Sequence, residues 1–337
     1  MKAITLKEFG GTENFEMTEV DNPILTEGTV KVKITATSFN PIDYQMRRGS
    51  SESKHLKSTI LGREMSGVIV EVEKSVTQFK IGDEIYGYVS NFGSNGTYAE
   101  YIVVPEVIIA HKPKNISFNQ ASALGVVGLT AIQTVEKCKI EINDKVFVTG
   151  GAGGVGSMVL RLLIKDGILN IYTTAGNQES IDKIISYGLP KENILNYKTE
   201  NVVEKILLLT NGEKIDFAID TVGEQMSETC ADVLKINSTY ADISFLTTEK
   251  AREKLFYIGT TIQSIFIYAY GIESNKEKMK YYNSRLTLLK DYLENNLISE
   301  TPINLLGGFN VKTVRKAHEI LEKNETKGDK LVMSILE

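Results

Sequence analysis

The sequence predicts an α/β protein with a compact, mostly β first part and a second part built on a doubly wound parallel sheet. Up to about residue 123, the pattern consists of short strand-like runs separated by glycine-rich turns. After about residue 124, strand-like and helix-like runs alternate, as they do in a parallel sheet covered by helices. The length of 337 residues is also too great for one ordinary hydrophobic core.

The first part of the chain has the period of β-strands. Residues 29–35 alternate between the two sides of a strand, and residues 67–73 are rich in valine. The turns between such runs are marked by Gly82, Gly87, Gly93 and Gly96. A mostly β domain fits this pattern.

The second part contains five candidate strands, which are expected at 145–149, 170–175, 193–197, 215–220 and 239–244. The run 260–269 is rich in β-branched and aromatic residues, so it is either a buried strand or a sheet edge paired with another subunit. We favour the shared edge, which predicts a homodimer. An amphipathic helix is expected at 279–296, and the strand-like tail 330–335 is expected to return to the first domain.

Composition excludes several classes of protein. A net charge of −5 provides no cationic field for nucleic acid, so no nucleic-acid partner is expected. No signal-peptide core and no apolar run of membrane-spanning length is present, which predicts a cytoplasmic protein without a membrane partner. Cys138 and Cys230 form no CxxC pair, so neither a disulfide framework nor a structural zinc site is expected.

The strongest local motif is TGGAGGVG at residues 149–156, between an apolar strand and a helix-like run at 157–165. Gly151, Gly153 and Gly156 fit the GxGxxG pattern, in which a bare backbone lets a diphosphate approach a helix N-terminus. Gly154 and Val155 complete this candidate cofactor-binding loop. A P-loop is excluded because no GK[ST] sequence follows. The expected ligand is a dinucleotide.

The end of the second strand indicates which dinucleotide binds. A carboxylate at that position would bind the ribose of NAD and repel the 2′-phosphate of NADP, but residues 173–178 read TTAGNQ. Asn177 and Ser180 can donate hydrogen bonds to a phosphate, and Lys183 can supply a counter-charge. NADPH is therefore the expected cofactor. Glu179 and Asp182 lie close enough to leave the strictness of that preference open.

The whole chain resembles the medium-chain dehydrogenase/reductase superfamily, and in particular its quinone oxidoreductase group. The matching segments follow in the order of the family: NPID at 40–43, GREMSG at 62–67, IGDEIYG at 81–87, GTYAEY at 96–101, GLTA at 128–131, TGGAGGVG, NY at 196–197 and DTVG at 220–223. The resemblance implies a GroES-like catalytic domain at 1–123, completed by 304–337, and a Rossmann domain at 124–303. The active-site cleft would lie between these domains.

The resemblance also implies that zinc is absent. Zinc-dependent members carry a cysteine in the segment that here reads Ser38, Phe39, Asn40, and a histidine before the glutamate of GREMSG. This chain has no cysteine there, and Arg63, a permanently charged donor, stands in place of the histidine. No metal site is therefore expected. Because an alkoxide would lack its Lewis acid, reduction is the favoured direction.

By resemblance, Asn40 and Asp43 are expected near the nicotinamide, where Tyr44 is one of several candidate proton donors. The expected cofactor contacts outside the glycine loop and the second strand are Thr130, Tyr197, Val222 and Lys330. Several of them also have an ordinary structural explanation, such as a turn at Asn40, a helix cap at Asp43 or a packing role for Tyr197.

The expected function is NADPH-dependent transfer of hydride to a quinone or another α,β-unsaturated carbonyl, without a metal. A 2-enoyl thioester reductase of the same fold is the first alternative, and Arg47, Arg48 and Lys54 could form the basic patch that an acyl carrier requires. A non-catalytic NADPH-binding sensor is the second alternative, since a Rossmann site can bind without turnover.

Overall fold

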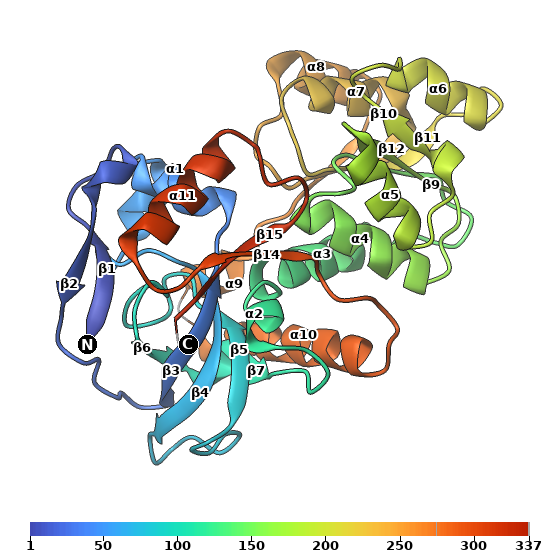
Figure 1. The fold of residues 1–337 in the computed structure, drawn as a ribbon. Helices are drawn as coiled ribbons and strands as arrows, with labels where there is room; N and C mark the ends of the chain where they lie inside the picture. Colours follow the sequence, from blue (N-terminus) through green and yellow to red (C-terminus); the bar gives the residue numbers. More distant parts are fainter. Residues whose placement is uncertain (274, 336–337) are drawn as a thin grey trace. The chain divides into compact units, whose positions relative to one another are not determined.

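The computed structural model describes residues 1–273 and 275–335 (Figure 1). The contacts of the chain divide it into two compact units. The first unit comprises Met1–Leu129 and Tyr268–Glu337, and the second comprises Thr130–Ile267.

The first unit is built on a seven-stranded sheet. Its strands lie in the order β14 (Ile303–Gly307), β15 (Lys330–Ser334), β3 (Thr29–Ser38), β4 (Glu64–Val72), β5 (Glu84–Tyr88) and β7 (Ile109–His111), while β6 (Tyr101–Pro105) pairs with β3. A separate two-stranded sheet is formed by β1 (Lys2–Leu6) and β2 (Phe15–Glu19). The strand-like runs expected at 29–35 and 67–73 are the central pair, β3 and β4.

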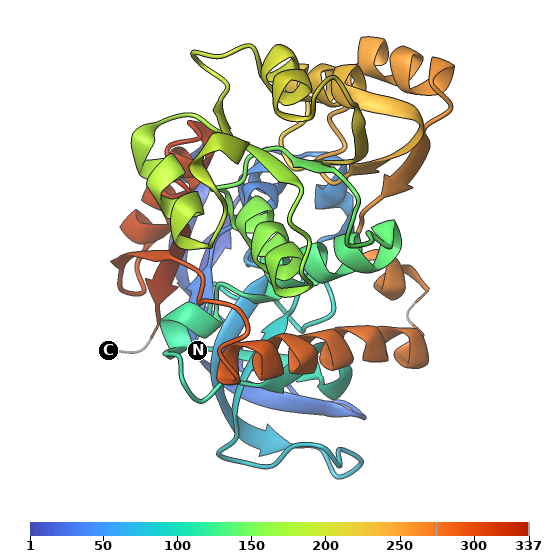
Figure 2. The ribbon, with the colours of Figure 1, turned by 90° about the vertical axis from the view of Figure 1, so that its right-hand side faces the viewer.

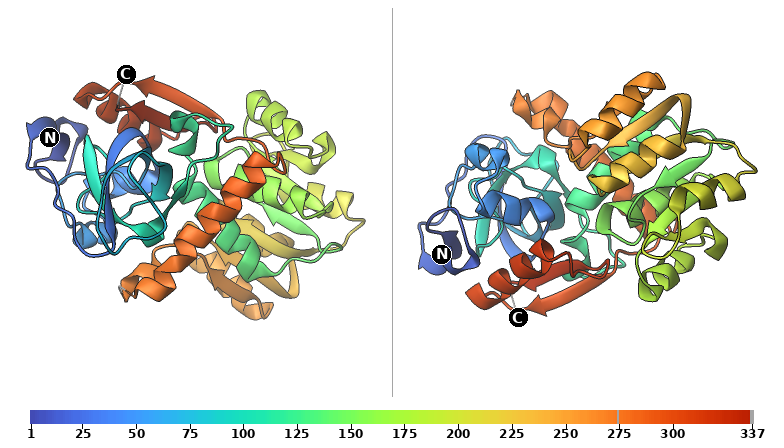
Figure 3. Two further views of the ribbon diagram at one scale, coloured as in Figure 1. Left: turned by 90° about the horizontal axis from the view of Figure 1, so that it is seen from below. Right: turned by 90° about the horizontal axis from the view of Figure 1, so that it is seen from above.

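The C-terminal segment completes this sheet, as expected for the tail. β15 pairs antiparallel with β3, so that Val332 lies opposite Ser38. The helix before it, α11 (Val311–Glu322), packs on α1 (Pro41–Arg47) and on β2. Figure 3 shows this segment, in red, beside the blue N-terminal strands.

The helix expected at 279–296 is α10 (Lys276–Glu294), preceded by the short α9 (Ala269–Ile272). Although the proposed domain boundary at residue 303 places it in the Rossmann domain, α10 belongs to the first compact unit. The Tyr86 hydroxyl donates to the Leu286 carbonyl at 2.6 Å, and the Asn283 amide donates to the Ile109 carbonyl at 2.6 Å. These hydrogen bonds attach α10 to strands of the first unit.

The second unit contains a six-stranded sheet in which every recorded strand pair is parallel. Its order is β10 (Ile194–Asn196), β9 (Ile171–Ala175), β8 (Val146–Val148), β11 (Ile215–Asp220), β12 (Leu234–Asp242) and β13 (Thr261–Ser264). The chain therefore runs outward from β8 in both directions, which creates a topological switch point between β8 and β11.

The other helices are α2 (Phe118–Ala121), α3 (Gly125–Cys138), α4 (Gly154–Lys165), α5 (Gln178–Ser186), α6 (Val202–Leu209), α7 (Gln225–Val233) and α8 (Glu249–Tyr257). Helices of the second unit alternate with its strands, as Figure 2 shows in green to orange. This architecture confirms the predicted fold class, a GroES-like β domain plus a Rossmann doubly wound sheet.

The expected strands of the second unit are present. One of them begins earlier than expected, and the structure shows whether the run 260–269 is buried or at an edge. β12 begins at Leu234 rather than at 239, and the left-handed backbone at Asn237, with φ of 57°, interrupts its early pairing. The run 260–269 contributes β13, which is a sheet edge rather than a buried strand, since Ile262 is 50% exposed. Over the part of the chain described, no helix has the length and apolar character to cross a membrane.

Candidate functional site

The glycine loop of the second unit forms a bare turn between β8 and α4. Gly150 has a φ of +64°, and a Cβ on Gly151 would stand 2.2 Å from the Thr173 hydroxyl oxygen. A Cβ on Gly156 would meet the Gly150 carbonyl oxygen at 2.3 Å. Side chains are therefore excluded at Gly151 and Gly156 by packing, and the backbone of the turn stays accessible to a ligand.

The N-terminus of α4 follows directly from this turn. The helix begins at Gly154. The Ser157 amide donates to the Gly153 carbonyl at 2.9 Å, one helical turn back. The N–H groups of Gly154, Val155 and Gly156 consequently have no partner inside the helix. Together with the helix dipole, these groups form a site that fits a diphosphate.

Asp220 holds the DTVG turn against the glycine loop, and the sequence reasoning did not identify this residue. Its fully buried carboxylate accepts the Thr149 hydroxyl at 2.8 Å and the amides of Val222 and Gly223 at 3.0 and 2.9 Å. The Tyr240 hydroxyl donates to its other oxygen at 2.7 Å. The available signal was an aspartate at the carboxyl end of a strand beside the switch point.

Val222 lies next to the loop as a result. A Cβ built on Gly150 would stand 3.0 Å from a methyl carbon of Val222, so the two turns are in contact. The structure thus brings Val222 together with the glycine loop. Its contact with a cofactor stays a prediction.

The end of the second strand carries no carboxylate from Thr173 to Gln178. Asn177 caps α5, because its side-chain oxygen accepts the amide of Ser180 at 2.8 Å. The Tyr197 ring packs on Gly176, where an added Cβ would stand 2.8 Å from the tyrosine oxygen. Asn177, Ser180 and Tyr197 therefore meet at one end of β9.

Two further expected cofactor residues lie on helices of the second unit. Lys183 is a half-buried residue in α5. Thr130 is buried in α3, where its carbonyl accepts the Thr134 hydroxyl at 2.8 Å. Their roles in cofactor binding stay predictions.

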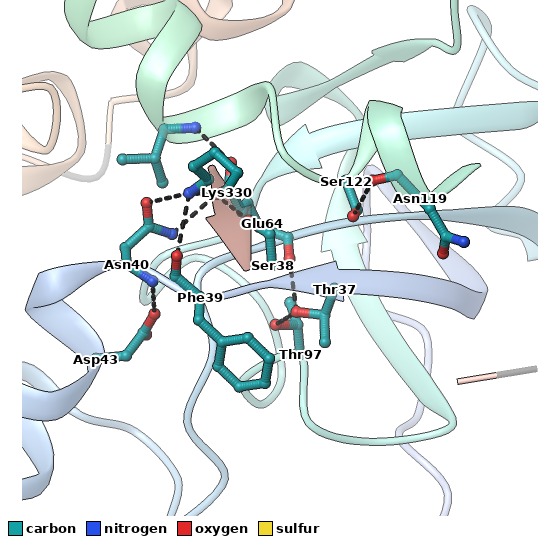
Figure 4. A network of polar contacts seen from close by, with 11 residues as sticks. Thr37, Ser38, Phe39, Asn40, Asp43, Glu64, Thr97, Asn119, Ser122 and Lys330 are labelled. Carbon is teal, nitrogen blue, oxygen red and sulfur yellow. Dashed lines mark hydrogen bonds and ion pairs between the residues drawn. The ribbon is translucent and has the colours of Figure 1, made fainter. Parts of the chain in front are cut away.

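The first unit brings together a separate polar cluster, centred on Glu64 and Lys330 (Figure 4). The Lys330 ammonium donates to the Glu64 carboxylate at 2.8 Å, to the Asn40 side-chain oxygen at 2.6 Å and to the Phe39 carbonyl at 3.2 Å. Lys330 was expected to bind the cofactor. Here its charge is used within the first unit, beside the expected catalytic residue Asn40.

Glu64 organises this cluster, and it is a second residue that sequence reasoning did not assign, although it lies in the GREMSG segment. It is fully buried. One carboxylate oxygen accepts hydrogen bonds from the Ser38 hydroxyl, the Lys330 ammonium and the side-chain amide of Asn40, the last at 2.8 Å. The other accepts the Val126 amide near the start of α3, at 2.7 Å. These bonds fix the orientation of the Asn40 amide.

Asp43 occupies the first turn of α1. One oxygen of its carboxyl group accepts the backbone N–H of Asn40 at 2.8 Å, as part of a capping box with Asn40. The other, Oδ1, is buried and makes no hydrogen bond within the described part of the chain. Burial raises the pKa of Asp43 to about 6, against the opposing charge of Arg63. Tyr44, the next residue, is half-buried.

Arg63, which by the resemblance stands where zinc-dependent members carry a histidine, is a buried residue of the first unit. It is 5% exposed, donates to the Ser90 hydroxyl at 2.6 Å and contacts the sulfur of Met46. Among residues 1–273 and 275–335, no three His, Cys, Asp or Glu side chains are grouped in a way that could hold a metal ion.

Comparison with known proteins gives matches to both units. Residues 26–114 match the alcohol dehydrogenase GroES-like domain, and residues 154–282 match the zinc-binding dehydrogenase family. The chain is 36% identical over 205 residues to a mitochondrial NAD(P)H oxidoreductase of Dictyostelium discoideum, an alignment that covers 58% of each chain. It is 30% identical to a 2-methylene-furan-3-one reductase of Solanum lycopersicum, of which 58% is covered. The chain thus spans somewhat over half the length of these two relatives.

Two other matches extend along nearly all of the chain. A chloroplastic NADPH-dependent alkenal/one oxidoreductase of Arabidopsis thaliana is 26% identical over 99% of this chain and 80% of its own length. The solved structure of a quinone oxidoreductase from Coxiella burnetii has a TM-score of 0.83, with 27% identity and 99% of both chains covered. The segment order, the fold and these matches agree: the chain belongs to the medium-chain dehydrogenase/reductase superfamily, in its quinone oxidoreductase-like group.

Proposed function

We propose that this protein is an NADPH-dependent oxidoreductase that transfers hydride to a quinone or another α,β-unsaturated carbonyl, without a metal. The observation that carries the proposal is the glycine turn at the N-terminus of α4, held beside the DTVG turn by Asp220. Quinone and alkenal/one oxidoreductases are among the relatives that match most of the chain.

The second unit would hold the cofactor. The amides of Gly154, Val155 and Gly156 suit the diphosphate, and Tyr197 lies near the end of β9, where the adenosine ribose of a dinucleotide binds in this fold. A bound nicotinamide supplies a hydride, which is chemistry that no side chain provides. The protein contributes binding and orientation.

The preference for NADPH rests on the end of β9. A carboxylate there would bind the 2′-hydroxyl of NAD, but the sequence from Ala175 to Gln178 has none. Asn177 and Ser180 are neutral, and Lys183 adds a positive charge one turn along α5. This arrangement favours a 2′-phosphate over a free hydroxyl.

The first unit would orient and polarise the acceptor. Lys330 and Glu64 hold the Asn40 amide in one orientation, so that its position is fixed before a substrate arrives. Arg63 cannot serve as a metal ligand, because a guanidinium has no free lone pair to donate at neutral pH. Metal-free reduction of an electron-poor acceptor fits these residues.

The test is loss of NADPH or NADH absorbance with separate panels of quinones and enones, on protein treated with a chelator. We expect turnover with NADPH that chelation leaves unchanged. Activity that disappears with the chelator and returns with zinc would contradict the metal-free mechanism. NADPH binding without turnover on either panel would favour a sensor instead.

The geometry weakens the alternative of a 2-enoyl thioester reductase. That reductase would need a basic patch formed by Arg47, Arg48 and Lys54. Arg47 is only 1% exposed and binds Glu322, and Arg48 binds the same carboxylate. Lys54 is the exposed member that is left. Two of the three cations therefore share one carboxylate within the first unit, and Arg47 is buried away from any acyl carrier.

We also propose a homodimer that forms through β13. This strand is the outer strand of its sheet, and Ile262, at its centre, is 50% exposed. Exposed sheet edges with apolar side chains are prone to pair with another chain.

A further inference from the structure

A small cavity of the first unit collects three buried polar atoms that have no hydrogen-bond partner in the described residues. They are Asp43 Oδ1, Arg63 Nε and Asn91 Nδ2. All three residues line the same cavity, which has a volume of about 20 Å³. Their exposed fractions are 1%, 5% and 7%, so bulk solvent does not satisfy these atoms.

The three atoms are complementary to one water molecule. With Asp43 ionised, Arg63 Nε and Asn91 Nδ2 can donate to the two lone pairs of a water oxygen, and Asp43 Oδ1 accepts one of the water protons. With Asp43 protonated, its Oδ1–H instead donates to the water, which then accepts from only one of the other two donors. A cavity of this size holds about one water, and buried waters typically make about three hydrogen bonds. An unpaired buried donor or acceptor costs roughly 1–3 kcal/mol, which a bound water would recover.

Charge and burial act on Asp43 in opposite directions. Burial disfavours its carboxylate form, and the nearby carboxylate of Glu64 adds to that effect. Arg63, the Asn40 amide and Lys330 favour the carboxylate. The buried Tyr98 hydroxyl is the other titratable group that interacts with Asp43. Burial dominates, so that the acid can hold a proton and release it close to neutral pH.

Two tyrosines of the same unit are poorer proton donors. Tyr98 and Tyr88 are both buried, and burial raises the pKa of each hydroxyl above its ordinary value. Tyr98 also shares a hydrogen bond with His318 at 3.2 Å. Asp43 is the acid nearer to neutrality, and it lies three residues from Asn40.

We propose that Asp43 is the proton source of the reaction and acts through a water bound in this cavity by Arg63 and Asn91. The proposal rests on the proposed function. The acceptor gains a hydride at carbon from the reduced cofactor and a proton at oxygen from the relay, which gives an enol; tautomerisation of this enol yields the hydroquinone or the saturated carbonyl. Asp43 becomes a carboxylate and regains its proton from solvent.

The central variant is Asp43→Asn. An asparagine oxygen can still accept the backbone N–H of Asn40, so the capping box is retained. The asparagine side chain cannot release a proton in this pH range. The matched control is Asp83→Asn, because Asp83 accepts the amide of Lys80 at 2.9 Å across the same spacing, outside the cavity.

The measurement is kcat/KM for NADPH oxidation as a function of pH. We expect the wild type and Asp83→Asn to lose activity above a pKa of about 6, since the protonated acid is the active form. Asp43→Asn should lose on the order of 10²-fold in kcat with NADPH affinity unchanged, and this pKa should disappear from its profile. An active Asp43→Asn enzyme with the wild-type profile would overturn the inference and leave the proposed function intact.

A second measurement does not depend on turnover. Because the folded protein holds the Asp43 proton more tightly than the unfolded chain does, the wild type should lose thermal stability relative to Asp43→Asn as pH rises from about 4 to about 8. A constant difference across this range would show that folding does not raise the pKa of Asp43, which would overturn the inference. If the wild type does not oxidise NADPH with any of the quinones or enones, the proposed function fails, and the proton-source role fails with it.

Discussion

At the scale of single residues, the most consequential contact is the buried pair of Glu64 and Lys330. Their side chains are 0% and 7% exposed and lie 2.8 Å apart. Burying two charges is costly in itself, but removing one partner leaves the other charge buried and unpaired. Such a pair contributes little net stability while penalising any loss of either member.

Replacing Lys330 with Met should therefore lower the free energy of unfolding by about 3–5 kcal/mol. The double variant Glu64→Gln with Lys330→Met should recover part of that loss, because no charge is then left unpaired. Denaturant unfolding of wild type, both single variants and the double variant completes the cycle. Additive losses would show that the two side chains are not coupled.

The proposed preference for NADPH can be tested at a single residue. Asn177→Asp should retain the cap on Ser180, since aspartate is an equally good N-cap, but it adds a negative charge at the end of β9. We expect kcat/KM with NADPH to fall by about tenfold or more, with NADH little affected. Asn201→Asp, at the cap of α6, is the matched control. Equal losses in both variants would argue against a 2′-phosphate site at Asn177.

At the scale of elements, helix α11 carries a buried histidine that should make stability sensitive to acid. His318 is enclosed by Phe15, Phe39 and Tyr98, and burial lowers its pKa to about 3, with Arg47 adding to the effect. The unfolded chain binds a proton at this side chain below about pH 6.5, whereas the folded protein does not. Folding stability should therefore fall as pH decreases from about 6.5 towards 3.

His318→Gln should remove this dependence and still accept the Tyr98 hydroxyl. The free energy of unfolding of the wild type should fall more steeply than that of the variant, by up to about 1.4 kcal/mol per pH unit between pH 6 and 4. Urea unfolding at several pH values measures both slopes. The exposed His111→Gln variant serves as the control and should keep the wild-type slope. Parallel slopes for wild type and His318→Gln would mean that His318 does not titrate as expected.

The same scale explains what the sequence could predict. Strands β8 to β11 and the glycine turn follow from local periodicity and glycine chemistry, and they are present as expected. The contacts of α10 were not predictable, because an apolar face indicates burial without indicating which strands it covers. The Lys330–Glu64 bond joins positions 266 residues apart, and no local pattern encodes such a separation. Asp220 was missed because its partners converge only once β11 lies beside β8.

At the scale of the whole molecule, the testable feature is the outer strand β13. Its pairing with β12 is parallel, and within the described residues its other edge has no recorded strand partner. Natural proteins usually protect such an edge with charge, proline or another chain. Thr261–Ser264 carries neither charge nor proline, and Ile262 is exposed, so this edge is where the proposed homodimer can be tested.

Ile262→Lys should therefore convert a dimer into a monomer, because a lysine ammonium would have to be desolvated at the shared edge. Light scattering at several protein concentrations measures the mass directly. Leu169→Lys is the control, since Leu169 is 76% exposed and lies two residues before β9, away from β13 in the strand order. A dimer that persists in Ile262→Lys would place the interface elsewhere, and a wild-type monomer at all concentrations would remove the shared edge altogether. If the control remains dimeric while Ile262→Lys does not, the apolar edge, and not surface hydrophobicity in general, drives association.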